Sequence, residues 1–213
     1  MKLIGITGGI GTGKSTVVEI LQKRGWKVYA SDATAKEIMA ADPVVRRELK
    51  EAFGEEVLTP EGVNAKVLSG LVFGESTEHH HRLTTLNRIV HPRVLDAHLA
   101  TIESERAKGT PLMAIESALL FEVELEEGFD WVVVVDAPEE VCIDRVVKRS
   151  GASPEEVKRR MSEQMSMEEK RGLADFVIDN GGSQEELEGA VGLVAMILES
   201  FPDPDSEEAP SED

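Results

Sequence analysis

The sequence predicts an α/β fold in which a five-stranded parallel sheet carries helices on both faces. Residues 8–15 read GGIGTGKS, a G-x-x-x-x-G-K-[ST] pattern, and they follow the apolar run Leu3–Ile6. Leu112–Ile115 and Trp131–Val135 are short, continuous apolar runs, as expected of strands covered on both faces. Helical patterns separate these runs, and strands joined through helices lie parallel in a sheet.

The first elements expected are a strand over residues 3–7, the glycine loop, a helix over residues 16–24 and a strand over residues 26–30. Gly25 is a suitable stop for the helix. Asp32 follows the second strand directly, at the sheet edge where open α/β folds bind their ligands.

The loop has the composition of a phosphate-binding site. Gly8, Gly11 and Gly13 allow the backbone to turn its N–H groups inward, and the following helix directs its positive end at the anion. Lys14 is expected to reach the outer phosphates, and the Ser15 hydroxyl to hold Mg²⁺. A chance match is disfavoured, because the loop lies between a strand and a helix as the pattern requires.

Residues 34–108 read as helical, with no strand expected and with breaks at residues 42–43, 54–62, 74–77 and 91–92. A stretch of this length between strands of one sheet predicts an inserted helical subdomain over residues 33–109. This insert is a suitable place for a substrate pocket.

After the fourth strand, a helix is expected from Glu139 to about Arg149 and a second one from Ser153 to about Lys170, together forming a lid over residues 141–171. Six cations lie on these two helices, and a solvated helical face is the alternative interpretation for them. They are Arg145, Lys148, Arg149, Lys158, Arg159 and Arg160.

The last strand is expected at residues 176–178, and Ser183 with Glu186 caps a closing helix that reaches about residue 198. The core therefore comprises residues 1–32, 110–140 and 172–200. Residues 201–213 form an acidic segment that lacks periodicity and is predicted to be a disordered tail.

Composition excludes several classes of function. A net charge of -18 over 213 residues argues against binding to nucleic acid or to an anionic membrane. Cys142 is the single cysteine, so no disulfide can form within the chain. No apolar run approaches the roughly 18 residues of a membrane span, and we expect a cytoplasmic protein.

The loop alone does not distinguish a kinase from a GTPase or a motor ATPase. The chain lacks the N-K-x-D guanine reader of GTPases, and residues 179–182 match D-x-x-G only at the far C-terminal end. A motor ATPase needs an Asp-Glu pair at a strand end, but Asp136 is followed by Ala137 and is expected to cap a helix. A small-molecule kinase needs an acceptor carboxylate, an acceptor pocket and mobile arginines, and the chain has candidates for all three. Asp32 could accept the hydroxyl proton, or it could cap a helix beginning near Thr34.

Several segments together resemble the bacterial dephospho-coenzyme A kinase family, which has the P-loop kinase fold. In chain order these segments are IGITGGIGTGKST, SDATAKEI, FGEEVL, GLVF, IVHPRV, ALLFE, FDWVVVVDAPEEVCIDRVVKR and ADFVIDNGGS. The resemblance implies ATP- and Mg²⁺-dependent phosphorylation of the ribose 3′-hydroxyl of dephospho-coenzyme A.

The resemblance also implies roles for individual residues. Asp32 becomes the general base, Lys14 stabilises charge on the outer phosphates, and Arg149 and Arg160 close onto the phosphates, with Gln164 one helical turn beyond Arg160. The residues implied for ATP are Gly8, Gly9, Gly11, Thr12, Gly13, Lys14, Ser15, Thr16, Arg145 and Asn180, with Mg²⁺ on Ser15. Those implied for the acceptor are Asp32, His91, Pro92, Leu119, Leu120 and Glu122.

The chain departs from the family pattern at several places, among them Thr34, which replaces a more usual residue. Ala118 replaces a proline, Asn64 is followed by Ala65 where the family has arginine, and the run 79–81 of three histidines has no counterpart. Without the family, His91 would be interpreted as a helix-end residue and Glu122 as an ordinary surface acid. Two other functions stay open from the residues: a kinase of a nucleoside monophosphate or sugar acid, and a nucleotide-dependent switch without catalysis.

Overall fold

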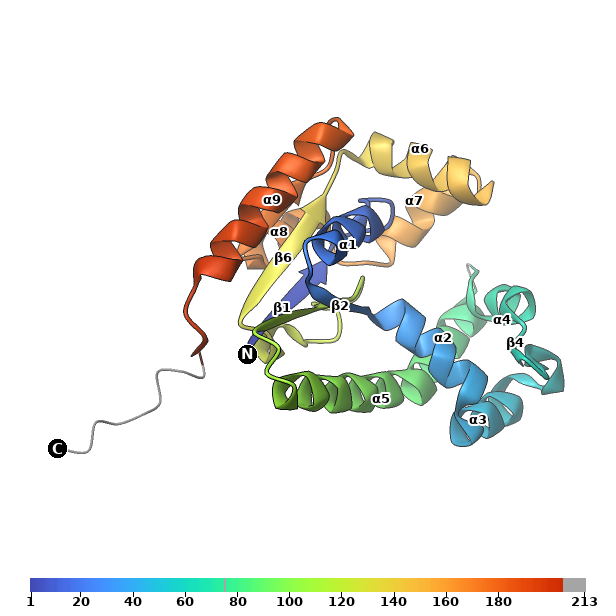
Figure 1. Cartoon of the computed structure of the whole chain (residues 1–213). Coiled ribbons are helices and arrows are strands. Elements are labelled where there is room, and N and C mark those ends of the chain that lie inside the picture. The colour runs from blue at the N-terminus through green and yellow to red at the C-terminus, as the bar shows by residue number, and fades with distance from the viewer. Residues whose placement is uncertain (75, 205–213) are drawn as a thin grey trace. The chain divides into compact units, whose positions relative to one another are not determined.

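The computed structural model describes residues 1–74 and 76–204, and the chain divides into two compact units (Figure 1). The first unit contains Met1–Ala30 and the chain from Glu105 onward, and the second contains Ser31–Ser104. Most of the predicted acidic tail, residues 205–213, lies outside the described residues. Among the described residues, no helix is both long and apolar enough to cross a bilayer.

The first unit is built on a five-stranded sheet with the order β2-β5-β1-β6-β7. All four strand pairings are parallel, which confirms the predicted sheet. The strands are β1 (Lys2–Thr7), β2 (Lys27–Ala30), β5 (Leu112–Glu116), β6 (Trp131–Asp136) and β7 (Phe176–Asp179). Since β1 lies between β5 and β6, its carboxyl end is at the middle of the sheet edge.

Helices cover both faces of this sheet, as predicted. Figure 1 shows α1 and α9 in front of the strands and α8 behind them. The front face buries Ile4 and Ile6 of β1 against Val17 of α1 and Val191 of α9. The helices of this unit are α1 (Lys14–Lys23), α6 (Glu139–Ser150), α7 (Pro154–Ser162), α8 (Met167–Leu173) and α9 (Gln184–Ser200), with a short 3₁₀ turn at Glu126–Gly128.

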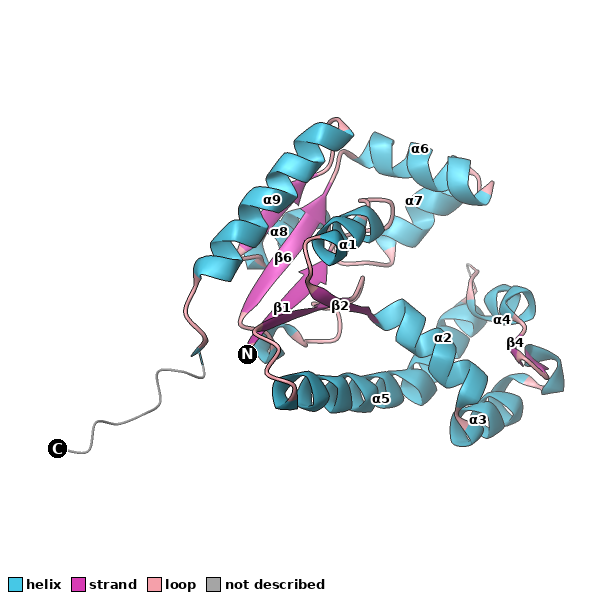
Figure 2. Cartoon of the chain, in the orientation of Figure 1, coloured by secondary structure: helices cyan, strands magenta, loops and turns pink. Residues whose placement is uncertain are grey.

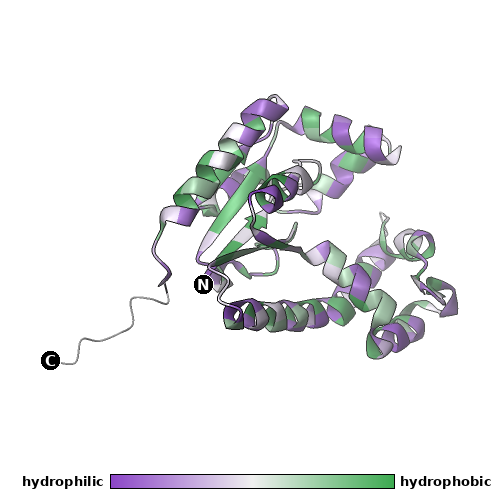
Figure 3. Cartoon of the chain, in the orientation of Figure 1, coloured by the Kyte–Doolittle hydropathy of each residue, from purple (hydrophilic) through white to green (hydrophobic). Residues whose placement is uncertain are grey.

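The opposite face of the sheet carries the turn that follows β5. Leu120 and Phe121 of this turn pack with Val132 and Val134 of β6, and the strands are strongly hydrophobic (Figure 3). A side chain at Gly5 would bring its Cβ within 2.7 Å of Leu120 Cδ1. Glycine in β1 therefore allows the turn to approach the sheet closely.

The second unit is mainly helical (Figure 2). Its core includes Val45 and Leu49 of α3, Leu68 and Val72 of α4, and Val90 of α5. The elements are α2 (Ser31–Ala41), α3 (Pro43–Phe53), a 3₁₀ turn (Glu55–Val57), β3 (Leu58–Thr59), β4 (Gly62–Val63), α4 (Ala65–Val72) and α5 (Thr77–Ala107), whose last residues belong to the first unit.

The expectation that residues 34–108 contain no strand was wrong, because β3 and β4 form an antiparallel hairpin. The Arg46 guanidinium supports this hairpin by donating hydrogen bonds to the carbonyl oxygens of Thr59 and Gly62. It donates a third to the carbonyl of Ala40, at the end of α2. The hairpin is therefore held by a side chain from α3 as well as by its own short ladder.

Two expected helix boundaries were also wrong. No break occurs at His91-Pro92, since Pro92 lies inside α5. Ile89, Val90 and Val94 pack in the core on either side of Pro92, and this burial offsets the loss of one backbone hydrogen bond. The helix expected from residue 153 to 170 is instead divided into α7 and α8, because Ser166 forms a new capping box with Glu169.

Lys2 is a buried lysine that closes the C-terminal end of α9. Its Nζ atom donates to the carbonyl oxygens of Leu198 (2.8 Å), Glu199 (2.7 Å) and Phe201 (2.8 Å). The last carbonyls of a helix lack partners within the helix and carry partial negative charge, so a cation at this position stabilises them.

We therefore expect Lys2→Met to lower the free energy of unfolding by roughly 1–3 kcal/mol, because three carbonyl groups lose a charged donor. Lys36→Met, at an exposed lysine in the middle of α2, is the control and should change stability by less than about 0.5 kcal/mol. Denaturant unfolding of both variants measures the difference, and equal effects would contradict the capping role.

Glu105 is a buried acid at the end of α5. Its carboxylate accepts hydrogen bonds from Lys108 (2.6 Å), Thr110 (2.7 Å) and Tyr29 (3.2 Å). The bonds from Lys108 and Thr110 lower the pKa of Glu105 from 4.5 to about 2. Because the pKa is lower in the folded state, the ionised carboxylate stabilises the fold above about pH 4.5, and this contribution is lost as the pH falls towards 2.

Glu105→Gln should therefore be less stable than the unsubstituted protein at pH 7, with a difference that shrinks as the pH falls from about 4.5 to 2. Unfolding by urea over a pH series measures this. Glu103→Gln, at an exposed position of the same helix, is the control and should follow the unsubstituted protein throughout. A constant difference between Glu105→Gln and the unsubstituted protein at all pH values would contradict the assignment.

Candidate active site

The glycine loop occupies residues 8–13, between the end of β1 and the start of α1. Gly8, Gly11 and Gly13 all have positive φ angles. At Gly13, φ is 91° and an added Cβ would lie 2.1 Å from Asn180 Nδ2. This position therefore requires glycine both for its backbone conformation and for the close approach of Asn180.

Asn180 and Arg145, both predicted to lie beside the nucleotide, are brought together with the loop. The buried Asn180 side chain follows β7 and donates from Nδ2 to the carbonyl oxygen of Thr12 at 2.7 Å. Arg145 of α6 donates from Nη2 to the Asn180 carbonyl at 2.9 Å. The loop, α6 and the turn after β7 thus form one hydrogen-bonded group at the carboxyl edge of the sheet.

Lys14 and Ser15 lie in the first turn of α1. The Lys14 ammonium donates to the carbonyl oxygens of Gly8 (2.8 Å) and Gly9 (3.1 Å), so it lies over the loop. Ser15 is exposed, and the first turn of α1 contains no acidic residue. The positive end of this helix is therefore not offset by a carboxylate of its own first turn, which suits an anionic ligand.

Two loop amides donate to side chains of the segment after α7. The Ile10 N–H donates to Gln164 Oε1 at 3.0 Å, and the Gly9 N–H donates to the sulfur of Met167 at 3.2 Å. These amides therefore point out of the loop, towards acceptor atoms. Such an arrangement fits the phosphate oxygens of a nucleotide, which are stronger acceptors than an amide oxygen or a thioether. The sequence did not indicate a place for Met167.

The turn after β5 contains Leu119, Leu120 and Glu122, which were predicted to contact the acceptor. Leu120 is fully buried, while Leu119 is half-buried. Glu122 pairs with Lys170 at 2.8 Å and accepts the Met165 N–H at 3.0 Å. It is therefore not an ordinary surface acid, and its contact with the acceptor stays a prediction. Lys170 is 0% exposed, although it follows two glutamates in a charged stretch of the sequence.

The two lid arginines differ in their surroundings. Arg149 is exposed near the end of α6, while Arg160 of α7 pairs with Glu156 one turn earlier. Their movement towards phosphates stays a prediction.

In the second unit, Asp32 is exposed and lies in the first turn of α2, which begins at Ser31 rather than near Thr34. Ser31 Oγ shares a hydrogen bond of 3.0 Å with Nε2 of His98, a buried residue of α5. Burial lowers the pKa of both His98 and the half-buried His91. Pro92, which was predicted to contact the acceptor together with His91, is exposed. The sequence analysis missed His98, although its spacing of seven residues from His91 places both on one helix face.

Two acids end the strands on either side of β1. Glu116 ends β5 opposite Ile6 of β1, and Asp136 ends β6. Asp136 pairs with Arg171 rather than capping a helix, since α6 has no side-chain cap, so the capping expectation was wrong. Sequence analysis missed Glu116, although an acid at a strand end beside a phosphate loop was a usable signal.

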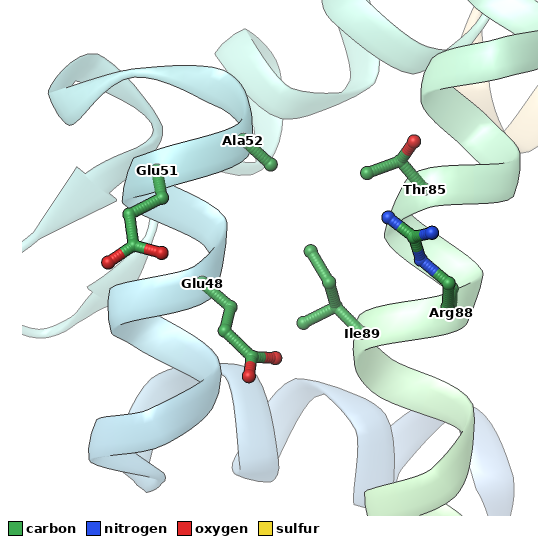
Figure 4. A pocket seen from close by; sticks show the side chains of 6 residues that line it. All are labelled: Glu48, Glu51, Ala52, Thr85, Arg88 and Ile89. Carbon is green, nitrogen blue, oxygen red and sulfur yellow. The ribbon is translucent and has the colours of Figure 1, made fainter.

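The second unit contains a pocket of about 500 Å³ between α3 and α5 (Figure 4). Glu48, Glu51 and Ala52 of α3 face Thr85, Arg88 and Ile89 of α5. With two carboxylates and one guanidinium in its lining, this pocket is poorly suited to phosphate groups. It contains none of the predicted site residues.

Comparison with known proteins identifies the family. The family model described as dephospho-CoA kinase matches residues 2–186. The chain belongs to the dephospho-CoA kinase family. Its relatives include a dephospho-CoA kinase from Bacteroides fragilis, 38% identical over 93% of this chain and 94% of that protein. A dephospho-CoA kinase from Thermobifida fusca is 37% identical over 91% and 94% of the two chains.

Solved structures agree with this assignment. A Thermus thermophilus protein has a TM-score of 0.76 and 38% identity, covering 94% of this chain and 98% of its own. Dephospho-CoA kinase from Campylobacter jejuni has a TM-score of 0.69 and 25% identity, covering 93% and 98%. This dephospho-CoA kinase is thus an ATP-using phosphotransferase, and the alternatives of a non-catalytic switch or another acceptor are set aside.

The close contact at Gly13 gives a test of the dephospho-CoA kinase loop. Gly13→Ala should raise the dissociation constant for ATP roughly tenfold or more, because the new Cβ displaces Asn180 from Thr12. Calorimetric titration with ATP measures the change.

Gly25→Ala is a matched control, since φ is 96° there but no atom lies within 4 Å of an added Cβ. Both variants carry the backbone strain of about 1–2 kcal/mol, but Gly25→Ala should bind ATP normally. Similar ATP affinities in the two variants would show that the contact with Asn180 does not shape the loop.

Proposed function

We propose that this dephospho-CoA kinase transfers the γ-phosphoryl group of ATP to the 3′-hydroxyl of the acceptor ribose, with the loop 8–15 as the phosphate site and Asp32 as the general base. The observation that carries the proposal is the outward direction of the loop amides. Gly9 and Ile10 already donate to acceptor atoms, and the Lys14 ammonium lies over the same loop.

The loop supplies electrostatic stabilisation for the transfer. Charge on the migrating phosphoryl group is spread over its outer oxygens, and fixed amide donors with a lysine stabilise that charge without reorganising. Lys14 is the residue for the outer phosphates in this proposal. Arg145 and Asn180 contribute the adenine side of the site, and Arg149 and Arg160 approach the phosphates when the lid closes.

The residues at the carboxyl edge fit Mg²⁺. The exposed Ser15 hydroxyl lies in the first turn of α1, and the half-buried Glu116 carboxylate ends the strand next to β1. Oxygen atoms of this kind are the ligands that Mg²⁺ prefers, so Ser15 would hold the ion with Glu116 as a second candidate. The ion would neutralise charge on the phosphate oxygens.

Asp32 has the properties that a base for an alcohol requires. Its carboxylate is exposed in the first turn of α2, and a carboxylate can accept the proton of an alcohol. We assign His91, Pro92, Leu119, Leu120 and Glu122 to the acceptor site on the family resemblance. A cytoplasmic location also remains a proposal, and the single cysteine of the chain supports it.

Asp32→Asn should lower turnover roughly 10²- to 10⁴-fold, because the amide cannot accept the hydroxyl proton. ATP affinity should stay near that of the unsubstituted protein. Formation of coenzyme A from ATP, Mg²⁺ and dephospho-CoA, followed by mass, measures turnover.

Glu37→Gln removes another exposed carboxylate of α2 and should leave turnover unchanged. Normal turnover by Asp32→Asn would rule out the base assignment, while absence of coenzyme A with the unsubstituted protein would rule out the acceptor.

A further inference from the structure

Two segments of the first unit are joined by a buried ion pair. We call Ser117–Leu125 the post-β5 turn and Gln164–Lys170 the strap. Lys170, at the end of the strap, is fully buried, and its Nζ atom lies 2.8 Å from Glu122 and 2.9 Å from the carbonyl oxygen of Ala118. Both partners belong to the post-β5 turn. A lysine is rarely buried to this extent without a specific charged partner.

The negative charge of the Glu122 carboxylate is compensated by the Lys170 ammonium. Its Oε1 atom accepts from Met165 of the strap as well as from Lys170. Its Oε2 atom is buried and has no hydrogen-bond partner among the residues that the structure describes. Without Lys170, the turn would hold a buried charge with one backbone donor, which is an unfavourable arrangement.

The strap also contacts the phosphate loop at its other end. Gln164 and Met167 accept the N–H groups of Ile10 and Gly9, as described above. Met165 and Met167 also pack against the cluster that contains Leu120 and Phe121 of the post-β5 turn. One segment of the chain is therefore bonded to the loop for ATP phosphates and to the turn assigned to the acceptor.

We propose that Lys170 is a positioning residue for the acceptor. Phosphates that bind the loop compete with Gln164 and Met167 for the N–H groups of Ile10 and Gly9. The end of the strap that contacts the loop must therefore give up these two hydrogen bonds when phosphate binds. The Lys170 ammonium holds the far end on Glu122 and Ala118, and thereby keeps the post-β5 turn in its acceptor-binding conformation. This inference rests on the proposed function, because the acceptor contacts of the turn are part of that proposal.

A purely structural ion pair would make a different prediction. Its loss would lower stability and the fraction of folded enzyme, which lowers the apparent kcat and leaves both KM values unchanged. A positioning residue for the acceptor should instead change the KM for dephospho-CoA and leave the KM for ATP nearly constant, since its two partners lie on the post-β5 turn.

The test compares Lys170→Met, Lys170→Arg and Lys27→Met. Lys170→Met should raise the KM for dephospho-CoA roughly tenfold or more while the KM for ATP stays within about threefold. Lys170→Arg keeps the charge and should recover most of the acceptor affinity. Lys27→Met removes an exposed lysine at the start of β2 and should resemble the unsubstituted enzyme. Parallel changes in both KM values, or a lower Tm with both KM values unchanged, would overturn the inference.

A second comparison applies if Lys170→Met fails to fold. The double variant Lys170→Met with Glu122→Gln removes both buried charges and is compared with Glu122→Gln alone. The double variant should have the higher KM for dephospho-CoA by roughly fivefold or more, and equal values would overturn the inference. If the proposed function is wrong, the unsubstituted enzyme forms no coenzyme A. If only this inference is wrong, the unsubstituted enzyme forms coenzyme A, and the variants do not differ in the KM for dephospho-CoA as expected.

Discussion

The parallel pairing of β1 between β5 and β6 is the constraint on which the site depends. Because all five strands point the same way, the segments that leave their carboxyl ends meet at one edge of the sheet. The phosphate loop leaves β1, the post-β5 turn follows β5, and Asn180 follows β7. Contacts between residues far apart in the sequence, such as Asn180 with Thr12, follow from this alignment.

The charge distribution explains how a protein of net charge -18 can hold a triphosphate. In the proposed site, the attraction for the anion is local, and comes from backbone amides, from the start of α1 and from Lys14. Two other lysines, Lys2 and Lys170, are buried, and each is surrounded by oxygen atoms of its own fold. Lys2 and Lys170 thus act at fixed structural positions and are not available to attract an anion from solution.

Much of the fold could be predicted from the sequence, because β1, β5 and β6 contain continuous apolar runs and the loop has a specific pattern. The β3–β4 hairpin could not, since each strand has only two residues and Arg46 supports the hairpin from another element. Pro92 indicated a break that packing overrides. Asp32, Lys14 and Asn180 could be proposed from motifs, but the burial of Lys170 could not be predicted, because a lysine after two glutamates has the pattern of a solvated helix.

The hydrogen bonds of the loop also bear on how it receives ATP. Gln164 and Met167 accept two loop amides, Asn180 donates to one carbonyl and Lys14 to two others, so the loop is already held in shape by its neighbours. In the proposed site, binding of phosphate at Gly9 and Ile10 is then an exchange of acceptors rather than the ordering of a flexible segment. Neutral acceptors give way to charged ones, and charge-assisted hydrogen bonds are about twice as strong as neutral ones. The free energy of ATP binding gains from this difference in hydrogen-bond strength. Because the loop is already held in shape, little conformational entropy is lost on binding.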